Sequence, residues 1–156
     1  MLVLAACGDD DGGGGTTGGG GEEDLVVGIS WNNYAQPRWA KADGPAIIEA
    51  VEAAGGTVIE TDANDSSEQQ LADVDSLINQ GADVLLQNTD SSAVLQTAEK
   101  NGKYAFGWDS DMSTYGPKAH LASAVANWGP YYIKAIDDVK AGTWKTERTV
   151  WGVKEG

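Results

Sequence analysis

From residue 25 onward, short apolar runs alternate with longer segments in which apolar residues recur every three or four positions. The short runs have the length of β-strands, and the longer segments have the period of amphipathic helices. The predicted strands are LVVGIS (25–30), TVIET (57–61), ADVLL (82–86), YAFGW (104–108), 121–125 and a last one at 149–153. The predicted helices begin near residues 38, 66, 91 and 130, and each ends at a glycine, at 55, 81, 102 and 142.

This alternation predicts an α/β fold with a mainly parallel sheet and helices on both faces, because successive strand–helix–strand units are right-handed and bring their strands side by side. The run ADVLL is almost entirely apolar, as a strand covered on both faces requires. A chain of 156 residues allows one such domain, and we expect a single Rossmann-like lobe over residues 25–156.

The first 24 residues differ from the rest in composition. Residues 1–6 are apolar and lead to the tetrad Leu-Ala-Ala-Cys, which ends at Cys7 and resembles the lipobox of bacterial lipoproteins. Residues 8–24 read GDDDGGGGTTGGGGEED, which is typical of a flexible tether. We therefore expect residues 1–6 to be the remnant of a truncated signal peptide, and residues 7–24 to be a lipidated cysteine followed by a tether.

Charge and composition exclude several functions. The net charge is −14, and six of the 24 acidic side chains lie before residue 25. This balance argues against nucleic acid and against an anionic membrane surface as partners, since both require clustered Lys and Arg. One cysteine and one histidine, His120, cannot form an intrachain disulfide or a Cys/His zinc site. His120 falls in a predicted strand, where a structural role is expected.

Ligands of parallel sheets bind beyond the carboxyl ends of the strands. Four segments lie there, at 30–34, 62–65, 87–90 and 108–113, and three of them combine amides, carboxylates and aromatic rings. Such side chains can pair with hydroxyl groups and cover the apolar face of a sugar or a base. With one cation nearby, they suit a neutral, hydroxylated small molecule. The candidate ligand-binding residues are Trp31, Asn32, Arg38, Asn88, Asp90, Trp108, Asp109 and Asp111.

Two other readings of these residues stay open. Asn and Asp at strand ends also form turns and helix caps. Asp109 and Asp111 could hold a hard metal or act as an acid/base pair, as in a flavodoxin-like enzyme. No further metal ligands and no nucleophile–base pair accompany them in the sequence, so we expect no catalysis, no metal and no cofactor.

Two stretches resemble type I periplasmic binding proteins. Residues 26–86, and above all SWNNYAQPRWAK, resemble the start of xylose- and ribose-type sugar-binding proteins. Residues 80–156 resemble the end of the basic membrane protein family, the PnrA-like substrate-binding lipoproteins of ABC transporters. The runs that carry this second resemblance are QGADVLLQNTDSSAV, YAFGWDSDMSTYGPKAHL and NWGPYYIKAIDDVKAGTWK.

The resemblance implies an extracytoplasmic solute-binding lipoprotein of a bacterial ABC-type uptake system, held at the cell membrane by its lipid alone, with an ABC permease as partner. It places Asp109 on ring hydroxyls of the solute, Asn88 and Asp90 in polar contacts, and Trp31 and Asn32 in the first loop, with Arg38 nearby. Family members usually have Ser-Phe-Asn after an Asp-rich first loop, where this chain has Ser-Trp-Asn-Asn. The solute therefore stays open between sugar and nucleoside.

Proteins of this kind bury their ligand between two lobes, whereas this chain has the strand–helix units of one. We therefore expect weak binding, or a homodimer that supplies the second wall. A sensory or chemoreceptor-coupled module would use the same pocket with a different protein partner, and is the alternative function.

Overall fold

The computed structural model describes residues 25–152, in which all strands form one parallel sheet in the order β2-β1-β3-β4-β5. The strands are β1 (Val26–Trp31), β2 (Thr57–Asp62), β3 (Val84–Gln87), β4 (Tyr104–Asp109) and β5 (His120–Val125). The α-helices are α1 (Gly44–Ala53), α2 (Ser67–Asn79), α3 (Ala93–Lys100) and α4 (Gly129–Ala141). The predicted α/β class and parallel sheet are confirmed.

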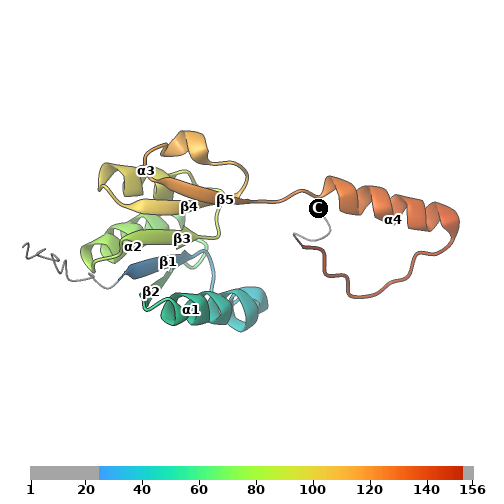
Figure 1. The fold of residues 1–156 in the computed structure, drawn as a ribbon, viewed down its shortest axis with the longest axis horizontal. Helices are drawn as coiled ribbons and strands as arrows, with labels where there is room; N and C mark the ends of the chain where they lie inside the picture. The colour runs from blue at the N-terminus through green and yellow to red at the C-terminus, as the bar shows by residue number, and fades with distance from the viewer. Residues whose placement is uncertain (1–24, 153–156) are drawn as a thin grey trace, which may run out of the picture.

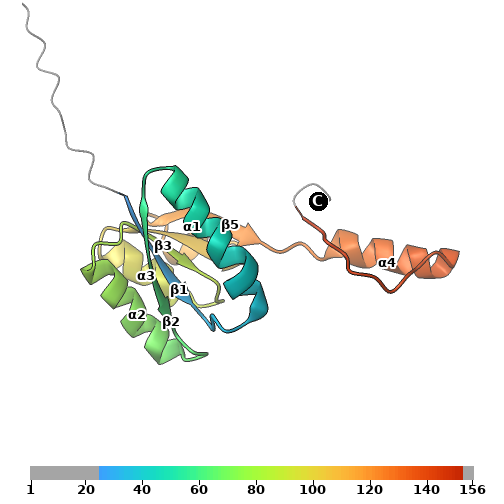
Figure 2. The ribbon, with the colours of Figure 1, turned by 90° about the horizontal axis from the view of Figure 1, so that it is seen from below.

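Figure 2 shows α1 on one face of the sheet and α2 and α3 on the other. Because side chains alternate across a strand, neighbouring residues of β3 enter different cores. Leu85 packs with residues of α2 and α3, such as Leu77 and Leu95. On the other face, Leu86 and Ile47 of α1 both pack against the cluster that includes Ile29. Helices therefore cover both faces, as predicted, although the α1 face has fewer of them.

Local sequence signals set most of the helix ends. The Ser66 hydroxyl accepts a hydrogen bond from the N–H of Gln69 at 3.1 Å and caps α2, as its spacing predicts. The Gln69 side chain donates to Asp73 instead of returning to the cap, so only half of a capping box forms. Gly81, which follows the cap residue Gln80 at the end of α2, has a φ of 99°, which residues with a Cβ rarely adopt.

The helix predicted from residue 38 to 54 forms as a helical stretch from 37 to 53, but it contains a π-helical turn. Residues Trp39–Asp43 form a π-helical turn, η1, and α1 begins only at Gly44. The N–H of Gly44 bonds to the carbonyl of Trp39, five residues back. Pro45 follows without an N–H to donate, so a regular α-helical hydrogen-bond ladder cannot run through this point.

The predicted strand at 149–153 is wrong for residues 149–152, which form no strand, while residue 153 lies outside the described residues. This segment runs back along α4 instead of reaching a sheet edge (Figure 1), and the ring of Trp151 meets that of Tyr131 edge-on at 5.6 Å. Packing on α4 replaces strand pairing here.

The helix predicted from Pro130 is confirmed as α4, but no residue of α4 is buried. Its apolar stripe, Tyr132, Ile133, Ile136 and Val139, is 54–64% exposed. In Figures 1 and 2, α4 lies beyond the end of β5 and away from the sheet. Within residues 25–152, every helix is too short or too polar to cross a bilayer.

Candidate functional site

The carboxyl ends of β1, β3 and β4 border an open hollow of about 510 Å³. This is the edge at which parallel α/β sheets bind ligands. Six of the eight predicted site residues line the hollow, together with two residues that were not predicted. The lining residues are Asn32, Arg38, Trp39, Asn88, Thr89, Asp90, Trp108 and Asp109.

Asn88 ties the first and third loops together. Its side-chain oxygen accepts a hydrogen bond from the backbone N–H of Asn32 at 2.8 Å. Its side-chain nitrogen is buried and has no partner among the described residues. A buried donor without an acceptor is costly, so this amide is suited to pair with a bound molecule.

The second predicted loop supports the site from behind. The two carboxylate oxygens of Asp65 accept hydrogen bonds from the side chains of Asn32, at 2.9 Å, and Asn33, at 2.6 Å. Asp65 itself has a φ of 63°, a left-handed conformation that Asp tolerates better than most residues. The loop at 62–65 thus holds the first loop in place and contributes no side chain to the hollow.

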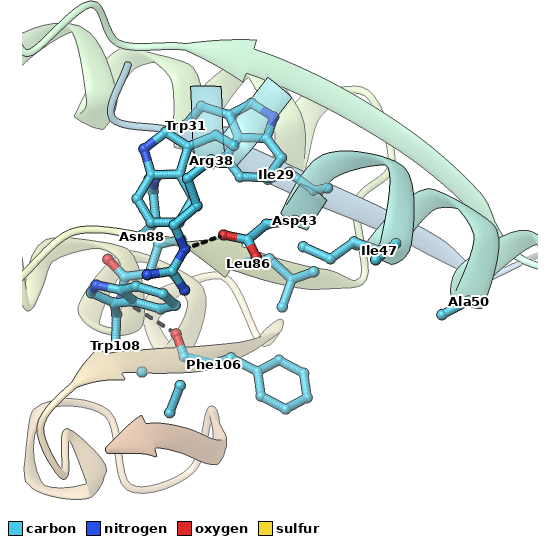
Figure 3. Close-up of a pocket in the computed structure, with 15 residues that line it drawn as sticks. Ile29, Trp31, Arg38, Asp43, Ile47, Ala50, Leu86, Asn88, Phe106 and Trp108 are labelled. Carbon is cyan, nitrogen blue, oxygen red and sulfur yellow. Dashed lines mark hydrogen bonds and ion pairs between the residues drawn. The ribbon is translucent and has the colours of Figure 1, made fainter. Parts of the chain in front are cut away.

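The guanidinium carbon of Arg38 lies 4.6 Å from the ring centre of Trp39. It lies 5.5 Å from the ring centre of Trp108 (Figure 3). The two rings meet edge-on at 5.7 Å. Arg38 Nε also donates to the Asp43 carboxylate at 2.7 Å. The positive charge is therefore already paired and stacked, while Asp90 and Asp109 line the same hollow.

Asp109 ends β4 in a left-handed conformation, with a φ of 64°. Its carbonyl accepts a hydrogen bond from the N–H of Ala126, which holds the backbone of the loop against the end of β5. Backbone held in a sparsely populated region is often found at ligand sites, where the surrounding structure maintains it.

Two predicted residues lie elsewhere. Trp31 is 3% exposed and its indole N–H donates to Glu60 at 2.8 Å, so it packs in the α1-side core behind the hollow. Asp111 does not line the hollow. Its carboxylate accepts the N–H of Ser113 at 2.9 Å, and this bond lowers the pKa of the Asp111 carboxyl below its ordinary value. Asp111 thus bonds to the first residue of the 3-10 turn η2 (Ser113–Tyr115).

The sequence reasoning missed Trp39 and Thr89. Trp39 had the spacing of a core-facing helix residue, and it is buried, but it also forms one wall of the hollow. The Arg38-Trp39 pair directly after the first loop was the available signal. Thr89 stands inside the predicted QNTD loop, and its hydroxyl lies 2.9 Å from the side-chain oxygen of Gln87.

We next considered His120 and possible metal ligands as catalytic groups. His120 contacts the Ser123 hydroxyl at 2.8 Å inside the β5 region, in the structural position expected from its strand. Among residues 25–152, no cluster of three or more His, Cys, Asp or Glu side chains could hold a metal ion. The hollow can form hydrogen bonds and stacking contacts with a ligand.

Comparison with known proteins places these features in a family. A purine-binding protein of Brucella abortus (strain 2308) is 48% identical over 80 residues, which are 51% of this chain and 23% of that protein. A putative ABC transporter glucose-binding protein of Haloferax volcanii is 29% identical over 79 residues, 51% of this chain and 20% of that protein. The chain thus spans less than a quarter of the length of these two relatives.

A solved structure from Mycobacterium smegmatis, in complex with β-D-fucofuranose, superposes with a TM-score of 0.56 at 25% identity. The superposition covers 76% of this chain and 41% of that one. The sheet and its helices have the fold of type I periplasmic binding proteins, as the sequence resemblance implied. The family model of PnrA-like ABC transporter substrate-binding proteins matches residues 56–156, more than half of the sequence, and the chain belongs to that family.

Proposed function

We propose that this protein binds a neutral, hydroxylated small molecule, a sugar or a nucleoside, in the hollow at the carboxyl edge of its sheet, and presents it to an ABC permease. One observation carries the proposal: the hollow combines the indole rings of Trp39 and Trp108 with the polar groups of Asn88, Asp90 and Asp109. The family assignment, to substrate-binding components of ABC transporters, supports the transport role.

The chemistry of the hollow favours hydroxyl groups over anions. Carboxylates accept hydrogen bonds from hydroxyls, and the unpaired amide of Asn88 can donate one. An indole face covers the C–H face of a sugar ring or stacks on a base. The charge of Arg38 is engaged by Asp43, so a phosphorylated ligand would meet two carboxylates without a free cation to offset them.

The relatives support both ligand classes. The Brucella protein is a purine-binding protein, and the Haloferax protein is a putative glucose-binding protein. The feature shared by nucleosides and sugars is a ring with adjacent hydroxyls, and we propose that Asp109 and Asn88 bind these hydroxyls. Because the hollow is open to solvent on one side, we expect a dissociation constant near the millimolar range.

A thermal-shift screen of the chain tests the ligand class. Glucose, xylose, adenosine and guanosine are compared with glucose 6-phosphate and AMP. With a dissociation constant of about 1 mM, about 20 mM of a soluble ligand should raise the melting temperature by about 5 °C. Equal shifts with the phosphorylated compounds, or no shift with any neutral one, would argue against the proposal.

We also propose that Cys7 carries the lipid that holds the protein on the extracytoplasmic face of the membrane. The tetrad Leu-Ala-Ala-Cys and the Gly-rich segment after it support this anchor, and both lie outside the described residues. Expression in a bacterium fed radiolabelled palmitate should label the wild-type chain and leave Cys7→Ser unlabelled. An unlabelled wild-type chain in the soluble fraction would contradict the anchor.

A further inference from the structure

A buried polar cluster lies between α2 and the loop that follows β3. Its centre is the hydroxyl of Thr89, which shares its proton between two side-chain oxygens, that of Gln87 at 2.9 Å and that of Gln70 at 3.1 Å. Gln87 is the last residue of β3, Gln70 belongs to α2, and both are buried. One hydroxyl thus joins the loop to a strand and to a helix.

The Gln87 side chain extends this contact to β4. Its amide nitrogen donates to the backbone carbonyl of Phe106 at 3.3 Å and lies 3.8 Å from the sulfur of Met112. Because a backbone carbonyl can only accept, this bond turns the Gln87 oxygen toward the Thr89 hydroxyl. The strand-side partner of Thr89 is therefore fixed in orientation by the backbone.

Gln70 is a poor choice of residue for stability alone. Its side-chain nitrogen is buried and has no hydrogen-bond partner among residues 25–152. A buried donor without an acceptor is costly, whereas an apolar side chain of similar size would avoid that cost. The Gln70 side chain does make one contact of a different kind, through its oxygen, and that contact is with the Thr89 hydroxyl.

Thr89 stands in the middle of the loop that borders the hollow. Residues 88–91 belong to no strand or helix, so ladder hydrogen bonds do not fix them. Asn88 and Asp90, on either side of Thr89, both line the hollow. Asn88 is tied to the backbone N–H of Asn32 in the first loop. The Thr89 hydroxyl provides the second tie, which reaches α2 on the other side.

We propose that Gln70 is a positioning residue for ligand binding, and that it acts through the Thr89 hydroxyl. Its contact holds residues 88–91 in the conformation in which Asn88 and Asp90 line the hollow. A loop that is ordered before the ligand arrives loses less conformational entropy on binding, so Gln70 raises affinity without touching the ligand. This role rests on the function proposed above, and Gln70 itself does not line the hollow.

Stability and affinity should separate in Gln70→Met. The midpoint of urea unfolding should equal or exceed that of the wild type, because the unpaired buried donor is removed. Calorimetry should show that the neutral ligand selected by the thermal-shift screen binds about 3- to 10-fold more weakly. A role in stability alone would lower the midpoint and leave the affinity unchanged, and that result would overturn the proposal.

Substitutions of Thr89 test whether Gln70 acts through the hydroxyl. Thr89→Val removes the hydroxyl and should weaken binding, whereas Thr89→Ser keeps it and should bind more tightly than Thr89→Val. Gln70→Met/Thr89→Val should bind no more weakly than Thr89→Val alone, since both changes break the same contact. If the two effects multiply, Gln70 acts by another route and the proposal is wrong.

NMR order parameters of the full chain without ligand test the positioning role by itself. The backbone amides of residues 88–90 should have values of about 0.85 in the wild type, and these should fall toward about 0.6 in Gln70→Met. Gln80→Met is the matched control, because Gln80 follows α2 and its side chain bonds to Ser76 of the same helix. It should leave residues 88–90 as in the wild type.

This measurement gives its answer whether or not a ligand binds. If no neutral ligand binds the wild type, the function proposed above fails, while the order parameters still decide whether Gln70 holds the loop. Order parameters of residues 88–90 that are the same in the wild type and in Gln70→Met would overturn the positioning role.

Discussion

Asp109 combines a left-handed backbone with a side chain at the hollow. Replacement by Gly removes the Cβ that disfavours this backbone, whereas replacement by Ala keeps the Cβ and loses the carboxylate. We expect Asp109→Ala to be less stable than Asp109→Gly by about 1 kcal/mol in urea unfolding. Both variants should lose ligand affinity. Equal stability of the two variants would mean that the backbone relaxes out of the left-handed region.

Asn88 has two roles that one substitution separates. Asn88→Asp keeps an oxygen that can accept the N–H of Asn32 and removes the unpaired amide donor. The unfolding free energy should change by less than about 1 kcal/mol, while ligand affinity falls about tenfold, since one hydrogen bond to the ligand is lost. Asn79→Asp, at the exposed end of α2, is the control and should leave affinity unchanged. Unaltered affinity in Asn88→Asp would remove Asn88 from the site.

For single residues, position at the end of a predicted strand was a good guide to the site, whereas residue type alone was a poorer one. Asn88 and Asp109 were predicted because they directly follow strands, and they line the hollow. Trp31 and Asp111 have residue types that suit a ligand site. However, the Trp31 indole N–H donates to Glu60, and the Asp111 carboxylate accepts from the N–H of Ser113. Residue type does not reveal which neighbour a side chain will bond, so such competition was not predictable.

At the scale of elements, the amino edge of the sheet is held by a charged contact. The Asp83 carboxylate accepts from Lys103 Nζ at 2.7 Å and lies 3.4 Å from the N–H of Val26, joining the starts of β1, β3 and β4. The Lys103 ammonium, more than the Val26 N–H, holds the pKa of Asp83 below its ordinary value.

A group with a lowered pKa in the folded state stabilises the fold above its unfolded pKa, near 4, and this contribution is lost as pH falls through the folded value. The wild type should therefore lose stability relative to Asp83→Asn as the pH falls from about 5 to below the unfolded pKa of Asp. The difference should stay below about 1 kcal/mol, because both side chains are partly exposed. Urea unfolding of the two proteins at several pH values measures it. A difference that is independent of pH would show that the contact contributes no proton linkage.

The hydrophobic pattern predicted the order and type of the elements, because the spacing of the apolar residues in each segment shows which of its faces is buried. It could not foresee the π-helical turn at Trp39–Asp43, which depends on how Pro45 interrupts the hydrogen bonds of one particular turn. It also placed a strand at 149–153, since a short run such as TVWGV has strand propensity whether or not a sheet edge is within reach.

At the scale of the whole molecule, periodicity gave the helix from Pro130 an apolar face but could not identify the surface that covers it. The apolar stripe of α4 is exposed. The family resemblances of residues 26–86 and 80–156 were visible in the sequence, and the sheet runs continuously through the residues that they share, 80–86. The sequence pattern was least informative about which surface packs against which.

Isothermal titration calorimetry with neutral and phosphorylated ligands tests the central claim most directly. Wild-type protein is titrated with the sugar and the nucleoside that give the largest thermal shifts, and with their phosphorylated forms. We predict saturable binding of at least one neutral ligand, with affinity at least about tenfold weaker for its phosphate. The reason is that Arg38, the one cation that lines the hollow among residues 25–152, is paired with Asp43. Absence of binding by every neutral ligand, or tighter binding of the phosphorylated forms, would contradict the account.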